Sequence, residues 1–197
     1  VRYISNASTG KMGYALVRAC LKRGAEVTLV SGPTHLSIKA WQAFCPLNVV
    51  DVVSSADMCN ATIKAFTQAD IAILCAAVAD FTPNTAADKK IKKQPGQKGM
   101  SIGLKTTTDI AATLGTDKKA HQKLIGFALE TDNEQANAER KLQTKNLDMI
   151  VLNSLRDKGA GFGVETNKVT LLYADGTKKD LPLLLKQEVA DTIIDSI

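Results

Sequence analysis

Residues 6–13 (NASTGKMG) are small residues and two glycines that lead into a helical pattern. Free backbone N–H groups at the start of a helix, together with the helix dipole, favour a phosphate at such a turn. The same residues also suit an ordinary helix start, in which Ser8 or Thr9 caps the helix and Gly13 allows tight packing. On this segment alone the two interpretations are about equal.

Two familiar phosphate-binding motifs are excluded at this turn. A P-loop has the pattern Gly-x-x-x-x-Gly-Lys-Ser/Thr, but Ser5 replaces its first glycine and Met12 follows the lysine. A dinucleotide fingerprint has the pattern Gly-x-Gly-x-x-Gly, but Ser8 replaces its first glycine. Ser31 and Gly32 stand where that motif needs an acid for the ribose. NAD binding is therefore disfavoured, and NADP binding less so, because it does not require the acid.

Two further stretches carry groups suited to a nucleotide-dependent reaction. In residues 75–81 (CAAVADF), two alanines would let a ligand lie against the backbone, and the Asp80 carboxylate could accept a hydrogen bond from it. The alternative is tight packing with Asp80 capping a turn. In residues 88–93 (DKKIKK), one ammonium could neutralise a triphosphate, while a solvated surface loop explains the other lysines.

The carboxyl half adds three candidates. Phe127, in residues 126–131 (GFALET), could pack on a nucleobase, although filling the core is the default interpretation. Lys141 and Lys145 are four residues apart and share one face of a helix. That face matters for function only if it borders the site.

The elements that must position these residues alternate between strands and helices. The patterns predict strands at 25–30, 48–53, 69–77, 101–105, 123–129 and 147–152, and a hairpin of 168–173 and 177–181 around Asp175-Gly176. They predict helices at 11–23, 56–67, 109–115, 133–145 and 184–197, and a short one near Trp41. Residues 78–99 are expected to form a long polar loop, and residues 159–163 a glycine-rich one.

This order predicts an α/β fold with a doubly wound, mainly parallel sheet, helices on both faces and a carboxyl-terminal β-hairpin. Ligands bind such sheets beyond the carboxyl ends of the strands. Residues 69–77 (ADIAILCAA) are nearly all apolar, which predicts a strand buried on both faces. Ser55 is expected to cap the second long helix.

Composition sets the limits of these interpretations. The chain has 197 residues, 45% of them hydrophobic, which predicts one folded domain over 1–197 and excludes wholesale disorder. Apolar runs are too short for a transmembrane helix, and a 5% aromatic content disfavours single-strand nucleic-acid binding. Four cysteines without CxxC spacing suggest reduced thiols of a cytoplasmic protein, and two histidines make a protein metal site improbable.

Taken in order, these stretches resemble the phosphopantothenoylcysteine synthetase family, and the bacterial, fused type is the closer match. The matching residues run over nearly the whole chain: 1–13, 24–33, 75–81, 90–93, 126–131, 145–150 and 162–163. The resemblance implies a Rossmann-like fold, a homodimer, and ligation of 4′-phosphopantothenate with L-cysteine. CTP and Mg²⁺ would drive the reaction through an acyl-cytidylate, with release of pyrophosphate and CMP. It also implies a decarboxylase half fused outside this chain.

The resemblance further implies roles for single residues. Asn6 would act in the cysteine step and contact phosphopantothenate, Ala76 and Ala77 would hold the pantothenoyl part, and Lys90 would stabilise charge at the α-phosphate. The implied nucleotide contacts are Ser8, Gly10, Gly13, Asp80, Thr108, Asp109, Ile110, Phe127, Lys141, Lys145 and Asn153. Thr108 stands where bacterial members often have proline. No protein ligand for the metal is implied, because Mg²⁺ would be held by the nucleotide phosphates.

The family normally begins with a further strand and loop ahead of the Val1 stretch. The sequence lacks that strand, so we expect a fragment of a longer chain whose sheet misses a central strand. Two other functions remain open. An NADP-dependent reductase would normally show Tyr-x-x-x-Lys, but Tyr3, Tyr14 and Tyr173 have no lysine four residues on. A nucleotide-binding module without catalysis is the third hypothesis. No nucleic-acid or membrane partner is expected.

Overall fold

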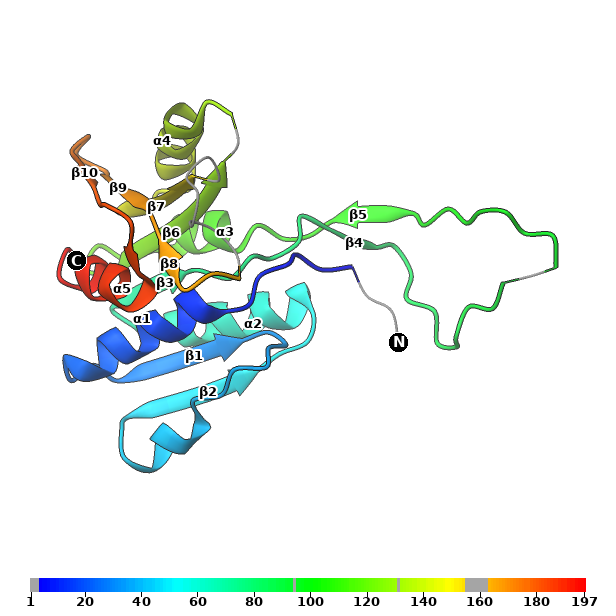
Figure 1. The fold of residues 1–197 in the computed structure, drawn as a ribbon, viewed down its shortest axis with the longest axis horizontal. Helices are drawn as coiled ribbons and strands as arrows, with labels where there is room; N and C mark the ends of the chain where they lie inside the picture. Colours follow the sequence, from blue (N-terminus) through cyan, green and yellow to red (C-terminus); the bar gives the residue numbers. More distant parts are fainter. Residues whose placement is uncertain (1–3, 94, 131, 155–162) are drawn as a thin grey trace.

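The computed structural model describes residues 4–93, 95–130, 132–154 and 163–197 (Figure 1). Thr131, Phe162 and all of the predicted glycine-rich loop except Gly163 lie outside them. The helices are α1 (Lys11–Lys22), the 3-10 helix η1 (Lys39–Ala43), α2 (Ser55–Phe66), α3 (Ile110–Asp117), α4 (Glu134–Thr144) and α5 (Lys186–Ile194). The strands are β1 (Val27–Ser31), β2 (Leu47–Asp51), β3 (Ile71–Leu74), β4 (Phe81–Pro83), β5 (Leu104–Thr106), β6 (Lys123–Glu130), β7 (Met149–Ser154), β8 (Thr166–Asn167), β9 (Val169–Tyr173), β10 (Lys178–Asp180) and β11 (Leu184–Leu185).

The main sheet has five strands in the order β10-β9-β7-β6-β3. Strands β3, β6 and β7 run parallel. Strand β9 pairs antiparallel with β7, and β10 forms the edge by pairing antiparallel with β9. Gly176 has a φ of 83° in the hairpin turn, a conformation that glycine adopts without strain. The predicted α/β architecture with a mainly parallel sheet and a terminal hairpin is confirmed.

Helices cover both faces of this sheet. Strand β6 sends Ile125 into a core shared with α1 and α5, and Leu124 and Ala128 into a second core shared with α2, α3 and α4. Strand β7 divides its residues in the same way, with Val151 on the first side and Ile150 on the second. The alternation of side chains across a strand therefore places apolar groups on both faces, as the continuous apolar runs predict.

A slot separates the main sheet from the pair β1-β2, which forms its own parallel sheet. Neither β1 nor β3 has a strand partner on the facing edge within the described chain. A groove of about 2180 Å³ is lined by both of these edges and continues to the carboxyl ends of the strands.

The prediction that strand β3 is buried on both faces is wrong. Ile71 is 45% exposed, and the rest of β3 is only half-buried. The apolar sequence of β3 favours burial. Its side chains would be fully buried only with a neighbouring strand along each edge. The open slot leaves β3 without one of them.

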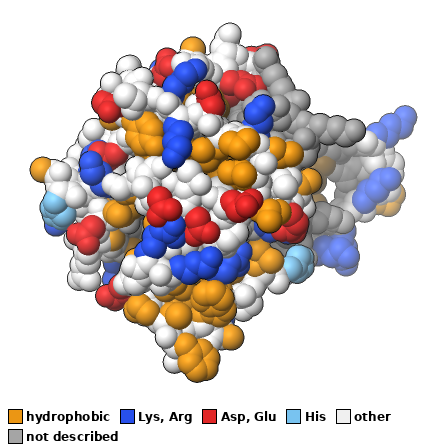
Figure 2. Space-filling model, turned by 60° about the vertical axis from the view of Figure 1, so that its left-hand side comes forward, with side chains coloured by type: hydrophobic (Ala, Val, Ile, Leu, Met, Phe, Trp, Pro, Cys, Tyr) orange, Lys and Arg blue, Asp and Glu red, His pale blue; other side chains and the backbone are white. Residues whose placement is uncertain are grey.

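An arm projects from the body between β4 and β5, where a polar loop is predicted (Figure 1). The two strands pair antiparallel, with Phe81 opposite Thr106, and form its root. Ile91, Met100 and Ile102 farther along are each more than half exposed. Figure 2 shows Lys and Arg side chains on this projecting part, while charges of both signs are interspersed over the body.

Two smaller predictions are corrected. Ser54, not Ser55, caps α2: its Oγ accepts from the Asp57 N–H at 3.1 Å, and the Asp57 carboxylate accepts from the Ser54 N–H. Residues 184–185 form β11 rather than helix, because they pair with β8. No helix in the described part of the chain is both long and apolar enough to cross a membrane.

Candidate active site

The predicted site residues gather along the groove at the carboxyl ends of β3, β6 and β7. The residues that line it include Asn6, Ser8, Gly10, Gly13, Ala76, Ala77, Asp80, Thr108, Asp109, Ile110, Phe127, Lys141, Lys145 and Asn153. Lys90 is the predicted site residue that does not. The parallel strands cause this gathering, because their carboxyl ends meet at the same edge of the sheet.

Asn6 is tied to the end of β3. Its Nδ2 donates to the carbonyl oxygens of Ala77 at 3.0 Å and Val78 at 3.4 Å. These bonds join segments more than 70 residues apart in the sequence. Asn6 therefore lies beside the two alanines with which the sequence analysis grouped it.

The turn before α1 begins the helix without a side-chain cap. Gly10 is the N-cap residue, with a φ of 79°, and no side chain accepts from the first turn of α1. The Thr34 hydroxyl holds the preceding backbone by donating to the Thr9 carbonyl oxygen at 3.0 Å. The interpretation of Ser8 or Thr9 as the cap is therefore wrong. The uncapped turn favours the phosphate-binding interpretation.

Two lysine–carboxylate pairs border the opposite wall of the groove. Lys145 Nζ lies 2.9 Å from Asp109 Oδ2, and Lys141 Nζ lies 2.6 Å from Glu130 Oε1. Asp109 also caps α3 by accepting from the Ala112 N–H at 3.0 Å. Burial opposes ionisation of Asp109, but this N–H and the Lys145 ammonium together lower its pKa. The face of α4 that carries the lysines thus borders the site. This is the condition under which Lys141 and Lys145 were expected to matter for function.

Phe127 lies within β6, and Asn153 lies near the carboxyl end of β7. Phe127 packs against the core of α1 and α5 and also lines the groove, so both of its interpretations hold in part. The Oδ1 atom of Asn153 is buried, with no hydrogen-bond partner among the described residues. A buried acceptor without a partner is costly, and the amine of a bound ligand would satisfy it.

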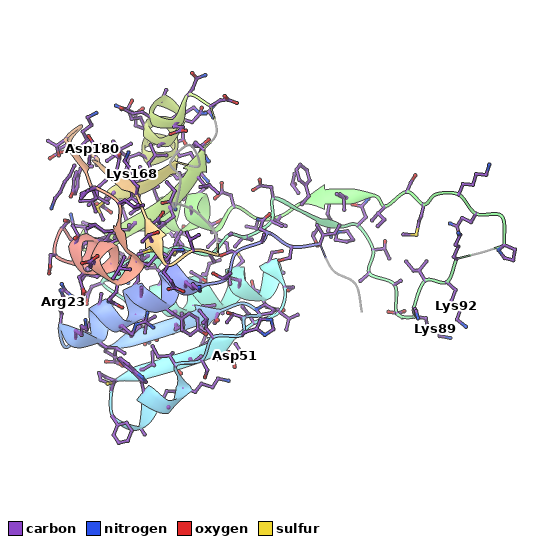
Figure 3. All side chains as sticks on the ribbon, in the orientation of Figure 1. Arg23, Asp51, Lys89, Lys92, Lys168 and Asp180 are labelled. Carbon is purple, nitrogen blue, oxygen red and sulfur yellow. The ribbon has the colours of Figure 1, made fainter. Side chains whose placement is uncertain are left out.

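The root of the arm fixes Asp80 at the edge of the groove. The Thr107 N–H donates to the Asp80 carbonyl oxygen at 2.9 Å, and the Thr107 hydroxyl donates to that of Ala79 at 2.8 Å. Lys90 lies much farther out: its neighbours Lys89 and Lys92 stand on the distal part of the arm (Figure 3). The structure therefore does not bring Lys90 together with the other predicted residues.

The four cysteines are free thiols, as predicted. Burial raises the pKa of the Cys75 thiol to about 12, and Lys186 lowers it to a smaller extent. Cys75 therefore stays protonated at neutral pH and is a poor nucleophile. No group of three His, Cys, Asp or Glu side chains in the described ranges is placed to hold a metal ion.

The sequence analysis missed two lysines of the site. Lys11 and Lys186 both line the groove, and Lys186 is only 7% exposed. The sequence carries little signal for them, because a lysine in the first turn of a helix usually faces solvent. Their burial depends on contacts between α1, α5 and residues 163–165.

Comparison with known proteins supplies the family. The sequence profile described as "DNA/pantothenate metabolism flavoprotein C-terminal domain" matches residues 1–197. The chain belongs to this family. Among solved structures, the C-terminal domain of the coenzyme A biosynthesis bifunctional protein CoaBC superposes with a TM-score of 0.80 at 39% identity, over all of this chain and 85% of that one.

Two curated relatives of the family extend the comparison. The coenzyme A biosynthesis bifunctional protein CoaBC of Bacillus subtilis (strain 168) is 48% identical over all of this chain and 47% of its own length. A protein of an unknown prokaryotic organism, named cysteine/cysteine sulfinic acid decarboxylase, is 54% identical over all of this chain and 53% of its own length. The chain thus spans about half the length of the curated relatives it matches.

Proposed function

We propose that this chain is the phosphopantothenate–cysteine ligase domain of coenzyme A biosynthesis, and that it uses CTP. The proposal rests on one observation, that three features lie along a single groove. They are an uncapped helix start, two alanines beside Asn6, and the two lysines of the lysine–carboxylate pairs. Membership of the family and likeness to CoaBC proteins support it. A decarboxylase half in the parent protein is part of the proposal, in line with the name "bifunctional" of that relative.

The reaction needs two displacements. A carboxylate oxygen of 4′-phosphopantothenate attacks the α-phosphorus of CTP, the bond to the leaving phosphate breaks, and an acyl-cytidylate and pyrophosphate form. The cysteine amine then attacks the acyl carbon, the bond to CMP breaks, and the amine loses a proton. The substrate carboxylate is activated directly, so no enzyme nucleophile is needed, consistent with the protonated Cys75 thiol. Mg²⁺ on the nucleotide phosphates would neutralise their charge.

Asn6 and Lys90 divide the two steps in this proposal. Asn6 lies against the carbonyl oxygens of Ala77 and Val78, where it can orient the acyl group for attack by cysteine. Lys90 neutralises the α-phosphate while pyrophosphate leaves, which requires the arm to bring it to the groove of this copy or of a second copy, because it stands apart from the groove in this structure. Asp80, at the root of the arm, and the paired Lys141 and Lys145 bind the nucleotide.

The projecting arm supports the homodimer. Its exposed apolar side chains, among them Ile91 and Met100, cost free energy in water until another surface covers them. In a two-fold dimer the same surface of each copy forms the interface, so each copy would cover the arm of the other. Sedimentation of the wild-type chain and of Ile91→Ser/Met100→Ser tests this proposal. A monomer in both samples, or a dimer in both, contradicts it.

Pyrophosphate release tests the ligase. CTP and, separately, ATP are mixed with Mg²⁺ and 4′-phosphopantothenate, without cysteine. The assay uses this chain and a version that carries, ahead of Val1, the corresponding segment of the Bacillus subtilis relative. Release with CTP alone supports both the activation step and the nucleotide. No release with either nucleotide in the extended version contradicts the ligase and leaves the reductase and the binding module.

Two variants test the division of roles. Lys90→Gln should suppress pyrophosphate release, whereas Lys92→Gln, a matched control on the same arm, should not. Asn6→Asp should release pyrophosphate but capture the acyl-cytidylate with cysteine slowly. Equal loss of both half-reactions in the Asn6 variant would refute the division. A nucleotide-binding module would instead show altered CTP affinity and no turnover in any variant.

A further inference from the structure

The segment that follows β3 departs from the main sheet. Strand β3 ends at Leu74, opposite Gly126, whereas β6 continues to Glu130. Residues 77–80, hereafter the strap, are irregular backbone that lines the groove, and all of them except Asp80 are half-buried. Half-buried carbonyl groups need hydrogen-bond donors, so the donors for the strap must come from other parts of the chain.

Two residues from distant parts of the chain supply these donors. Asn6 Nδ2 donates to the first two carbonyl oxygens of the strap, at 3.0 and 3.4 Å. The Thr107 hydroxyl donates to the third, that of Ala79, at 2.8 Å. The Thr107 N–H donates to the fourth, that of Asp80, at 2.9 Å. All four consecutive carbonyl groups of the strap are therefore bound, two by each residue.

Thr107 also connects the strap with the opposite wall of the groove. It follows β5 directly, at the root of the arm (Figure 1). Two residues later, Asp109 caps α3 and pairs with Lys145. Thr107, Asp109 and Lys145 all line the groove. A shift of the strap relative to Thr107 would therefore separate the wall near Asn6 from the wall that carries the lysines.

The hydroxyl is the part of this attachment that depends on the type of residue at position 107. Any residue except proline supplies the N–H that binds the Asp80 carbonyl oxygen, whereas the bond to Ala79 needs a side-chain donor at that place. The Asp80 side chain is exposed, so its own burial does not fix it. Its place at the edge of the groove depends on the backbone that the Thr107 hydroxyl holds.

We propose that Thr107 is a positioning residue, whose hydroxyl keeps the strap, and with it Ala77 and Asp80, in place for both substrates. This inference rests on the proposed function, in which Ala77 lies against the pantothenoyl part and Asp80 binds the nucleotide. Because one strap carries both residues, loss of the hydroxyl weakens the binding of CTP and of 4′-phosphopantothenate together. The groups that take part in the displacements stay unchanged.

Steady-state kinetics of pyrophosphate release, with cysteine present for turnover, test the inference in whichever version of the chain is active. Thr107→Val keeps the shape of the side chain but removes the hydroxyl. The KM for CTP and the KM for 4′-phosphopantothenate should each rise roughly fivefold, the effect of one lost hydrogen bond, while kcat stays within about threefold of wild type. Thr107→Ser keeps the hydroxyl and should recover most of both losses. Thr116→Val removes an exposed hydroxyl that donates to a carbonyl oxygen within α3, and it should leave all three constants unchanged.

Three results would overturn the inference. A rise in only one of the two KM values would mean that Thr107 acts on that substrate alone, for example by direct contact. Unchanged KM values would mean that the strap keeps its place without the hydroxyl. A fall in kcat in step with the unfolding midpoint, at constant KM, would mean a purely structural role, because partial unfolding lowers only the active fraction.

Hydrogen exchange separates this inference from the proposed function. If wild type releases no pyrophosphate with any nucleotide, the ligase proposal fails and the attachment of the strap is judged alone. The amide of residue 107, which donates to the Asp80 carbonyl oxygen, should be protected about fivefold less in Thr107→Val than in Thr116→Val. Equal protection in the two variants would refute the attachment.

Discussion

Strands β6 and β3 are hydrogen-bonded neighbours, but within the residues that the structure describes β6 has a strand on each side and β3 has a strand on one side only. Ile73 of β3 lies opposite Ile125 of β6 in the register. Ile125 is 1% exposed, whereas Ile73 is only partly buried at the margin of the same core. The difference shows that cover from both edges, rather than the apolar character of a strand, decides how much stability it contributes.

The same contrast bears on the site. Asn6 reaches the segment after β3 through two hydrogen bonds to its backbone, next to the open slot. The opposite wall rests on β6, β7 and α4, which pack over a buried core. We therefore expect the half of the groove near Asn6 to open more readily than the half near Lys141 and Lys145.

The pair of facing isoleucines gives the largest expected effect. Ile125→Ala should lower the free energy of unfolding by about 3 kcal/mol, because it leaves a cavity in a closed core. Ile73→Ala should cost only about 1 kcal/mol, because the side chain is already partly in water. Urea unfolding of both variants measures the difference. Equal losses would show that the slot is closed in solution.

Filling the slot should make the two strands alike. In the version extended by the segment of the Bacillus subtilis relative, Ile73→Ala should cost about 2 kcal/mol, because a strand beside β3 completes its burial. Ile125→Ala should keep its cost and serves as the internal control. Urea unfolding again provides the measurement. An unchanged cost for Ile73→Ala would mean that the added segment does not enter the slot.

The arm extends the comparison to a segment that buries almost nothing. When both proteins are compared as monomers at low concentration, replacing residues 85–101 with a short Gly-Ser linker should change the free energy of unfolding by less than about 0.5 kcal/mol, since the described side chains of this range are largely exposed. Pyrophosphate release should nevertheless be lost with Lys90. Unfolding and activity measured on one preparation check both statements. A large loss of stability would show that the arm packs on the body.

The ion pairs of Arg23 at the contact between α1 and α5 give the smallest effect. Hydrogen bonds from Arg23 lower the pKa of Asp191 and of Asp195 below their ordinary value. Their contribution is therefore complete above about pH 4 and is lost as the pH falls through the lowered pKa values. Arg23→Met should therefore lower the free energy of unfolding slightly at neutral pH and leave it nearly unchanged at the lowest pH, which flattens the acid limb of the stability curve. If stability falls at low pH in Arg23→Met as it does in wild type, other carboxylates cause that fall.

Much of the fold follows from local patterns. The helical pattern of residues 11–23 predicted α1, and Asp175-Gly176 predicted the terminal hairpin. The boundaries moved where a partner strand intervened, as for Leu184 and Leu185, which pair with β8. The order of the strands then gathered most of the predicted site residues in one groove.

Three features were beyond the reach of the sequence. Lys186 resembles any exposed lysine until α1 and residues 163–165 cover it. Lys90 belongs to the lysine-rich residues 88–93, but these residues lie on the projecting arm, and Lys90 does not line the groove. One interpretation of the sequence had Ser8 or Thr9 as the cap of α1, but Gly10 is the N-cap residue.

The sequence by itself determined which segments form the main helices and strands and which side of each is apolar, because those features depend on residues a few positions apart. It also determined which chemical groups follow the strand ends. Only the tertiary structure decided that Lys186 is buried and that Lys90 stands apart from the groove. Burial and distance are set by neighbours far away in the chain, such as Asn6 and Ala77, and no local pattern encodes them.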